Sequence, residues 1–313
     1  MDDPKYSKFN VSTTVYKNVN GQDIDLGVMI PKDAHAGPRP ILVHFHGGFL
    51  VAGHAMYPEW FANWAIDYSL LHSAIVVSPN YRLFPESTGL EILSDIRDFW
   101  TWIQDDLPAY LKSVGSEVTP DYSKVSAYGE SAGGYLAIMS ALTQPDLVKA
   151  VIAAYPMTYI DSDWYCVAST TKFPFGSPQV PVAVFEEHVK GTPKGKIFTG
   201  AFPPERMELA ISILQSGGFT GLGDDESLFL DRVLEKLNAD RRMPFLFAFH
   251  GTEDSAVPCE QTKKFVGKWE EKFGKGSVVG KWEKGDHGVD NETTLEEPWL
   301  QAGLTGVTKA WID

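Results

Sequence analysis

The chain has 313 residues, of which 43% are hydrophobic, 22% charged and 12% aromatic. This composition is typical of globular proteins and excludes disordered, collagen-like and coiled-coil proteins. With 27 Lys and Arg against 41 Asp and Glu, the formal net charge is −14, which disfavours nucleic acid and acidic lipid surfaces as partners because like charges repel.

The chain begins with a predicted hairpin and continues with alternating strands and helices. Residues 9–30 contain two β-rich runs joined at Asn20-Gly21, a tight-turn dipeptide. Further on, short apolar runs predict buried strands, and apolar residues at helical spacing predict helices. The expected strands are 41–45, 74–78, 125–128, 150–155, 244–250 and 278–282, and the expected helices are 90–104, one from residue 132, 260–272 and 296–311. This alternation predicts an α/β fold with a mostly parallel central sheet and helices on both faces.

One long segment interrupts the alternation. Residues 158–243 separate two expected strands, whereas connections in α/β units usually have about 2–6 residues. We therefore predict a core formed by residues 1–157 and 244–313, with 158–243 as an inserted lid or cap over the functional edge of the sheet. A small independent domain is the alternative. Helices are expected within this segment at 204–215 and 227–237.

The cysteines and the chain ends carry no sign of export. Cys166 and Cys259 are too few for a disulfide framework and match no zinc or iron–sulfur pattern, so we expect reduced thiols. The first ten residues lack the basic and apolar regions of a signal peptide, and no segment approaches the ~20 apolar residues that span a bilayer. We therefore expect a cytoplasmic protein without membrane association.

A candidate nucleophile lies between an expected strand and an expected helix. Residues 129–133 read Gly-Glu-Ser-Ala-Gly, a GxSxG pattern, and its small residues permit a sharp turn that exposes the hydroxyl of Ser131. A serine nucleophile needs a histidine base that is oriented by a carboxylate. In the strand–turn–helix context of GxSxG the chain order is serine, acid, histidine, so the base should follow Ser131.

Three histidines follow Ser131. His287 lies in a loop after the last expected strand and is the favoured base, whereas His188 lies in the insert and His250 at a strand end, where packing explains it. The acid should come from the loop 251–258, and Asp254 is favoured. Glu253 in the same loop is its rival, and Asp286 is disfavoured because adjacent side chains tend to point apart.

The sequence also offers a turn for an oxyanion. His46-Gly47-Gly48-Phe49 follows the strand 41–45 and is similar to HGGG-type turns that supply backbone N–H donors, with a further N–H from Ala132. His44 and His46 alternate on one strand, but no third ligand stands at suitable spacing, so we predict no metal site.

Taken together, these motifs resemble the hormone-sensitive-lipase-like esterases of the α/β-hydrolase superfamily, in particular fungal fold-3 members. The resemblance covers about residues 40–155 and 244–290. It is carried by HGGFLVAG at 46–53, YRLFPES at 81–87, Asp95 and Trp102, GESAGG at 129–134, and the Asp254 and His287 loops. It implies that the amides of Gly48, Phe49 and Ala132 bind the oxyanion and that residues 81–83 brace the site. Phe49 replaces the usual third glycine, and the insert matches no pattern of the family.

Three functions follow from this interpretation. The first is hydrolysis of a carboxylic ester of a small apolar or aromatic substrate through an acyl-enzyme, with no cofactor. The second is a dedicated enzyme of fungal secondary metabolism that uses the same triad for acyl transfer, thioester or lactone opening, or a non-hydrolytic acid–base step. The third, least favoured, is a non-catalytic ligand receptor. The oligomeric state stays open, and a homodimer is one of the alternatives.

Overall fold

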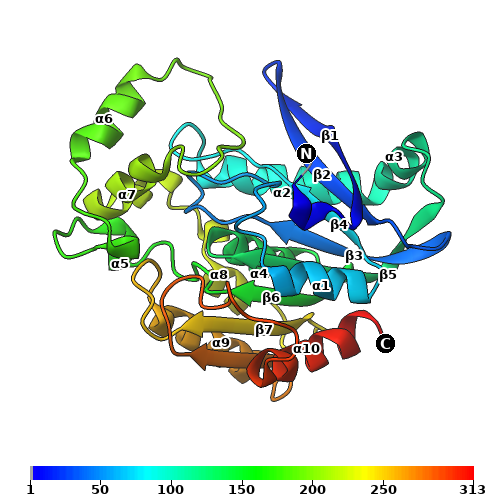
Figure 1. The fold of residues 1–313 in the computed structure, drawn as a ribbon. Coiled ribbons are helices and arrows are strands. Elements are labelled where there is room, and N and C mark those ends of the chain that lie inside the picture. Colours follow the sequence, from blue (N-terminus) through cyan, green and yellow to red (C-terminus); the bar gives the residue numbers. More distant parts are fainter. Residues whose placement is uncertain (1–2) are drawn as a thin grey trace.

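The computed structural model describes residues 3–313, and a sheet of eight strands forms its centre (Figure 1). The strand order is β1-β2-β4-β3-β5-β6-β7-β8; the two pairs that involve β2 are antiparallel and all others parallel. The strands are β1 (Phe9–Val19), β2 (Gln22–Pro31), β3 (Gly37–Phe45), β4 (Ile75–Pro79), β5 (Val118–Glu130), β6 (Val148–Ala154), β7 (Phe245–Gly251) and β8 (Val278–Glu283). The expected mostly parallel sheet is confirmed.

The N-terminal hairpin is present as expected, whereas two strand boundaries differ from the prediction. Asn20 and Gly21 both have positive φ, 53° and 77°, which is the backbone of a tight type I′ turn. β3 begins at Gly37 instead of 41, and β5 begins at Val118 instead of 125, because the two strands pair with each other beyond the rest of the sheet. Proline is tolerated in this part of β3, since β4 pairs only with residues 41–43 and leaves the other edge free.

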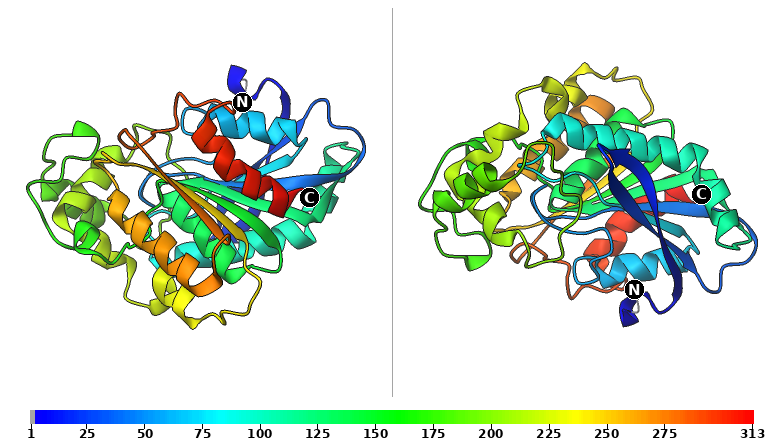
Figure 2. Two further views of the ribbon diagram at one scale, coloured as in Figure 1. Left: turned by 90° about the horizontal axis from the view of Figure 1, so that it is seen from below. Right: turned by 90° about the horizontal axis from the view of Figure 1, so that it is seen from above.

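Helices cover both faces of the sheet (Figure 2). On one face lie α1 (Asn63–Leu71) and α10 (Pro298–Trp311), and on the other lie α2 (Gly89–Asp105), α3 (Leu107–Ser113), α4 (Ala132–Thr143) and α9 (Cys259–Phe273). α1 and α3 were not expected from the sequence. In α1 the buried residues Trp64, Ala65 and Ile66 are consecutive, so the segment lacks the spacing that indicates an amphipathic helix.

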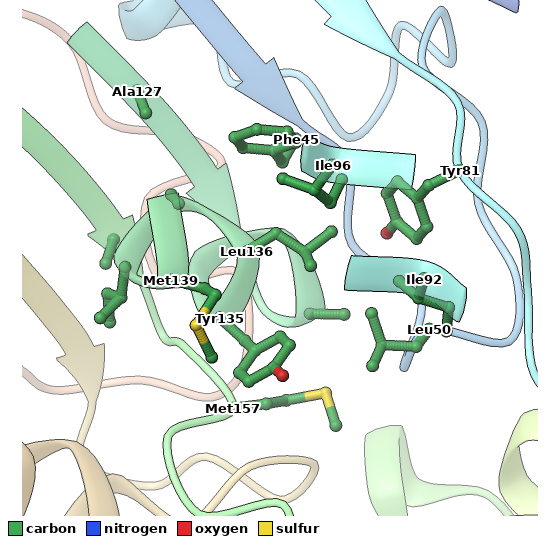
Figure 3. Packing of buried hydrophobic residues seen from close by; sticks show 14 of the residues in the cluster. Phe45, Leu50, Tyr81, Ile92, Ile96, Ala127, Tyr135, Leu136, Met139 and Met157 are labelled. Carbon is green, nitrogen blue, oxygen red and sulfur yellow. The ribbon is translucent and has the colours of Figure 1, made fainter. Parts of the chain in front are cut away.

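The helix that follows Ser131 lies at the centre of the core. Every residue from 132 to 142 in α4 is buried, so this helix cannot shift without disturbing its surroundings. Figure 3 shows Tyr135, Leu136 and Met139 of α4 packed among side chains from β3, α2 and neighbouring loops, which include Phe45, Leu50, Tyr81, Ile92, Ile96 and Met157. This packing fixes the start of α4, where the candidate nucleophile lies.

Most of segment 158–243 forms a lobe beyond the carboxyl ends of the strands (Figure 1). Its helices are α5 (Asp163–Cys166), α6 (Val182–Gly191) and α7 (Met207–Ser216), with the 3₁₀ turns η2 (Pro174–Gly176), η3 (Gly218–Leu222) and η4 (Glu226–Leu228) and the helix α8 (Leu230–Lys236). α7, η4 and α8 lie where helices were expected, whereas α5 and α6 were not expected. α8 packs against α4 and α9, so the end of the segment joins the helix layer of the sheet.

Two further observations concern the whole described chain. A short 3₁₀ turn, η1 (Pro4–Tyr6), precedes β1, and both cysteines carry free thiols. Among residues 3–313, every helix is too short or too polar to cross a bilayer.

Candidate active site

Ser131 occupies a strained turn between β5 and α4. Its backbone has φ 57° and ψ −116°, a conformation that few L-residues adopt. The flanking glycines are required by close contacts: a Cβ on Gly129 would lie 2.2 Å from the carbonyl oxygen of Gly133, and a Cβ on Gly133 would lie 1.9 Å from that of Phe45. The backbone N–H of Ser131 donates to the carbonyl of Ala154, 2.8 Å away. The turn is therefore held from both sides, as the GxSxG pattern predicts.

Asp254 and His287 are brought together from the loops after β7 and β8. Oδ2 of Asp254 lies 2.7 Å from Nδ1 of His287. Oδ1 accepts hydrogen bonds from the amides of Ala256 and Val257, both at 2.8 Å, so the carboxylate is fixed and its side chain is fully buried. Because Nδ1–H donates to Asp254, Nε2 of His287 is left free to accept a proton.

The charge of Asp254 is stabilised by its neighbours. Burial alone would raise the pKa of this carboxyl, but the charge on His287 and the contacts with His250 and His287 outweigh burial and hold the pKa well below its usual range. Asp254 is therefore an anion throughout the neutral range and can orient the imidazole of His287.

Ser131 and His287 line the same cavity, which has a volume of about 410 Å³. Among the described residues, the structure contains no hydrogen bond between the Ser131 hydroxyl and the His287 ring. Such contacts between nucleophile and base commonly tighten only when substrate binds. The imidazole is held on its other sides by the edge of the Tyr155 ring, with centroids 4.4 Å apart, and by Phe175 at 5.4 Å.

The two rival acids make different contacts. Glu253 is exposed. One carboxylate oxygen of Asp286 accepts hydrogen bonds from the amides of Ser255 and His287, both at 2.7 Å. Asp286 therefore ties the acid loop to the histidine loop through backbone contacts, and Asp254 is the carboxylate that contacts the His287 ring.

His250 contacts the acid, which sequence reasoning missed. Its Nε2 lies 2.9 Å from Oδ2 of Asp254 and 3.0 Å from the carbonyl oxygen of Val257. Both neighbours are acceptors, so Nε2 carries a proton, and Nδ1 pairs with the Thr262 hydroxyl at 2.9 Å. The signal available in the sequence was that His250 lies near the carboxyl end of β7, at the same sheet edge as the loop of Asp254.

The glycine turn after β3 presents free backbone N–H groups. Gly48 and Phe49 have φ of 103° and 61°, and the carbonyl of Gly48 accepts from the amides of Val51 and Ala52, which closes the turn. The amides of Gly48, Phe49 and Ala132 find no acceptor among the described residues. Gly48 and Phe49 line the cavity, and Ala132 begins α4, where the helix dipole favours an anion.

Polar contacts behind the glycine turn hold it in place. The Tyr81 hydroxyl donates to the carbonyl of His46 at 2.7 Å, and the two rings stack with centroids 4.3 Å apart. The guanidinium of the adjacent Arg82 donates three hydrogen bonds to the buried carboxylate of Asp95, at 2.8, 2.9 and 3.1 Å. This is the brace that the resemblance implied.

His44 and His46, which alternate on β3, make separate contacts. His46 is fully buried beside Gly47, and burial lowers its pKa to about 3, so the ring is neutral. His44 contacts Ser78 and Glu130. Within residues 3–313 the structure places no group of three or more His, Cys, Asp or Glu side chains so that they could hold a metal ion.

The insert forms one wall of the cavity. Phe175 and Met207 from the insert face the cavity together with Phe49, Trp60 and Tyr155 of the core. The insert is also bonded to the glycine turn: Nε of Arg206 donates to the carbonyl of Val51 at 2.6 Å, and Ala201 and Gly53 exchange backbone hydrogen bonds of 2.7 and 3.0 Å. The guanidinium of Arg206 also forms a buried ion pair with Glu86 at 2.7 Å.

The chain is similar to one protein family, to individual fungal proteins and to solved structures. A family model described as alpha/beta hydrolase fold matches residues 42–186. A probable carboxylesterase of Cochliobolus lunatus, clz11, is 30% identical over 63% of this chain and 92% of that protein. A probable carboxylesterase of a Phoma species, M8, is 29% identical over 99% of this chain and 100% of that protein.

Two other kinds of protein also match. The non-reducing polyketide synthase ascC of Acremonium egyptiacum is 32% identical over 60% of this chain, which corresponds to only 8% of that synthase. Among solved structures, esterase 2 of Thermogutta terrifontis superposes with a TM-score of 0.59 over 98% of this chain and 94% of that chain, at 17% identity. At this identity the structural likeness establishes the fold.

Proposed function

The chain belongs to the α/β-hydrolase family, within its hormone-sensitive-lipase-like branch, and we propose that it is a carboxylic-ester hydrolase that uses Ser131, His287 and Asp254 as its catalytic triad. The observation that carries the proposal is the 2.7 Å contact between Asp254 and His287 at the rim of the cavity that Ser131 lines. Relatives named as carboxylesterases support the ester as the bond that is cleaved.

The mechanism proceeds through an acyl-enzyme. Oγ of Ser131 attacks the ester carbonyl while Nε2 of His287 takes the hydroxyl proton, and Asp254 stabilises the imidazolium. The amides of Gly48, Phe49 and Ala132 donate to the oxyanion. The imidazolium then protonates the leaving alkoxide, and the C–O bond to it breaks. Water, deprotonated by His287, attacks the acyl-enzyme and releases the acid and the free Ser131 hydroxyl.

The walls of the cavity favour a small apolar or aromatic substrate. Four aromatic side chains and one methionine line it: Phe49, Trp60, Tyr155, Phe175 and Met207. Its volume of about 410 Å³ lies near the lower end of the range of about 300–1,000 Å³ that is typical of ligand pockets, which suits a small ligand. The lining residues include no Lys or Arg, so a substrate carboxylate or phosphate would find no counter-ion there. We propose that the insert acts as a cap that selects such esters.

Similarity to polyketide synthases favours a second candidate function. Segments of several such synthases match 51–81% of this chain. The same triad then opens a thioester or lactone of a fungal metabolite, or transfers the acyl group to an acceptor other than water. A non-hydrolytic acid–base step by His287 belongs to the same class.

Two measurements test these proposals. Mass spectrometry after treatment with a fluorophosphonate should find the label on Ser131 alone, and an unlabelled Ser131 would refute both candidates. A panel that compares short nitrophenyl esters with matched acyl thioesters then separates them. A general esterase turns over the short esters, whereas a dedicated enzyme barely does. The cytoplasmic location stays a prediction from the sequence.

A further inference from the structure

A chain of buried polar groups runs beneath the glycine turn. It begins at Glu130, the residue before Ser131, whose side chain is only 5% exposed. One carboxylate oxygen of Glu130 accepts the backbone N–H of Gly47 at 2.8 Å. The other lies 3.0 Å from Nε2 of His44, and Nδ1 of the same ring lies 3.0 Å from the Ser78 hydroxyl.

The hydrogen-bond partners determine where the protons are. Oγ of Ser78 lies 2.9 Å from the carbonyl oxygen of Ala55 and 3.0 Å from that of His44, and both oxygens can only accept. The hydroxyl of Ser78 has one proton and three acceptors within reach, the two carbonyl oxygens and Nδ1 of His44. Nε2 of His44 faces a carboxylate oxygen of Glu130, which can only accept, so Nε2 carries a proton and donates to Glu130.

The ring of His44 packs against two aromatic rings. It lies flat against Phe61, with centroids 4.0 Å apart and planes 10° apart, and Tyr128 stacks at 5.4 Å. The ring of His44 is 1% exposed, so water cannot replace these contacts.

We propose that the buried hydrogen bond between His44 and Glu130 positions the oxyanion site of the proposed hydrolase. The carboxylate of Glu130 holds the first amide of the turn, that of Gly47, and thereby directs the next amides, of Gly48 and Phe49, toward the cavity. Glu130 also lines this cavity beside Ser131, where its negative charge would oppose a developing oxyanion. The hydrogen bond from Nε2 of His44 stabilises this charge and holds the carboxylate on the amide of Gly47. The inference rests on the proposed function, and both residues are positioning residues, since they act through the glycine turn.

Three variants separate this role from simple packing. His44→Phe keeps an aromatic ring but leaves the buried charge of Glu130 without its partner. Glu130→Gln keeps every hydrogen bond without the carboxylate charge: the amide oxygen accepts from Gly47, the amide nitrogen donates to Nε2 of His44, and the ring proton moves to Nδ1, which donates to Ser78. The double variant removes the unpaired charge that the His44→Phe protein retains.

The expected results follow from the loss of oxyanion donors. In His44→Phe, kcat on a nitrophenyl ester falls about 100-fold, while KM changes less than about threefold. A trifluoromethyl ketone mimics the tetrahedral intermediate, and it binds about 100-fold more weakly to this variant. Glu130→Gln retains kcat within about tenfold. Adding Glu130→Gln to His44→Phe restores kcat at least tenfold, a rescue that loss of packing cannot produce.

Controls keep the two proposals distinguishable. His72→Phe, a similar exchange at the end of α1 and remote from the cavity, should leave kcat unchanged, and circular dichroism and thermal melting report on folding. If His44→Phe does not fold, His44→Gln with and without Glu130→Gln gives the same comparison. A wild-type Ser131 that resists the fluorophosphonate refutes the proposed function itself. A labelled wild type with no loss in His44→Phe, or no rescue by Glu130→Gln, overturns this inference alone.

Discussion

Replacing Asp254 with asparagine tests the orientation of the proposed base. Oδ1 of Asp254 accepts two backbone N–H groups, from Ala256 and Val257, so the asparagine side chain must keep its oxygen in that place. Its amide NH₂ then occupies the place of Oδ2, 2.7 Å from Nδ1 of His287. Two donors cannot face each other, so His287 changes to the tautomer that carries its proton on Nε2. In that form it cannot accept the proton of Ser131.

The expected loss in kcat is about 10⁴-fold, which corresponds to about 5 kcal/mol of transition-state stabilisation. The assay is steady-state hydrolysis of a short nitrophenyl ester, together with the rate of fluorophosphonate labelling of Ser131. Glu253→Gln is the matched control, because Glu253 is exposed, and its activity should equal that of the wild type. Asp286→Asn keeps the oxygen that accepts from the amides of Ser255 and His287, so its kcat should fall less than about tenfold. An Asp254→Asn protein that retains a tenth of wild-type kcat would refute the reasoning.

Other predictions concern stability and specificity. Gly133→Ala should lower the unfolding free energy by more than about 4 kcal/mol, because its Cβ would lie 1.9 Å from the backbone of β3. Gly267→Ala, on the exposed face of α9, should raise the unfolding free energy by about 0.5–1 kcal/mol. Urea unfolding measures both changes. His46, whose pKa burial lowers to about 3, binds its proton in the unfolded chain below about pH 6.5. The contribution of His46 to the unfolding free energy is therefore fully present above this pH. Below it, the unfolding free energy falls by up to about 1.4 kcal/mol per pH unit, as urea unfolding at pH 7 and 5.5 should show. Phe175→Ala should raise KM for an aromatic ester about two- to tenfold with little change in melting temperature, because its half-exposed ring contacts the His287 ring at the cavity wall.

Each of these predictions has a result that contradicts it. A Gly133→Ala protein as stable as Gly267→Ala would show that the turn tolerates a side chain. A His46→Gln protein with the same loss of stability between pH 7 and 5.5 would assign that loss to other groups. An unchanged KM in Phe175→Ala for aromatic and short aliphatic esters alike would remove this ring from the substrate site.

The sequence predicted the features that depend on local pattern and chain order. The GxSxG turn, the alternation of strands and helices, and the choice of Asp254 over Glu253 as the partner of the His287 ring needed only neighbouring residues and the rule that parallel strands end at one edge. The length of β3 did not follow from its own residues, because pairing with β5 extends it through two prolines.

Contacts between distant segments could not be predicted in this way. Glu130 meets His44 across 86 residues, and the stacking of Phe61 on that histidine joins two further parts of the chain. His250 appeared to be a packing residue because nothing in its own strand shows that Nε2 approaches Asp254. Such networks depend on tertiary geometry, and no local pattern in a single sequence indicates them.

The attachment of Arg206 to the core has a consequence for recombination between relatives. Residues 158–243 look like an exchangeable module, yet the guanidinium of Arg206 is bonded to Val51 and Glu86, which lie outside them. A foreign segment that lacks this arginine buries the Glu86 carboxylate without a counter-ion and frees the loop next to the nucleophile. A chimera that exchanges this segment must therefore take residue 86 from the same parent. In a chimera that keeps the original residue 86, altered selectivity and slower turnover will appear together.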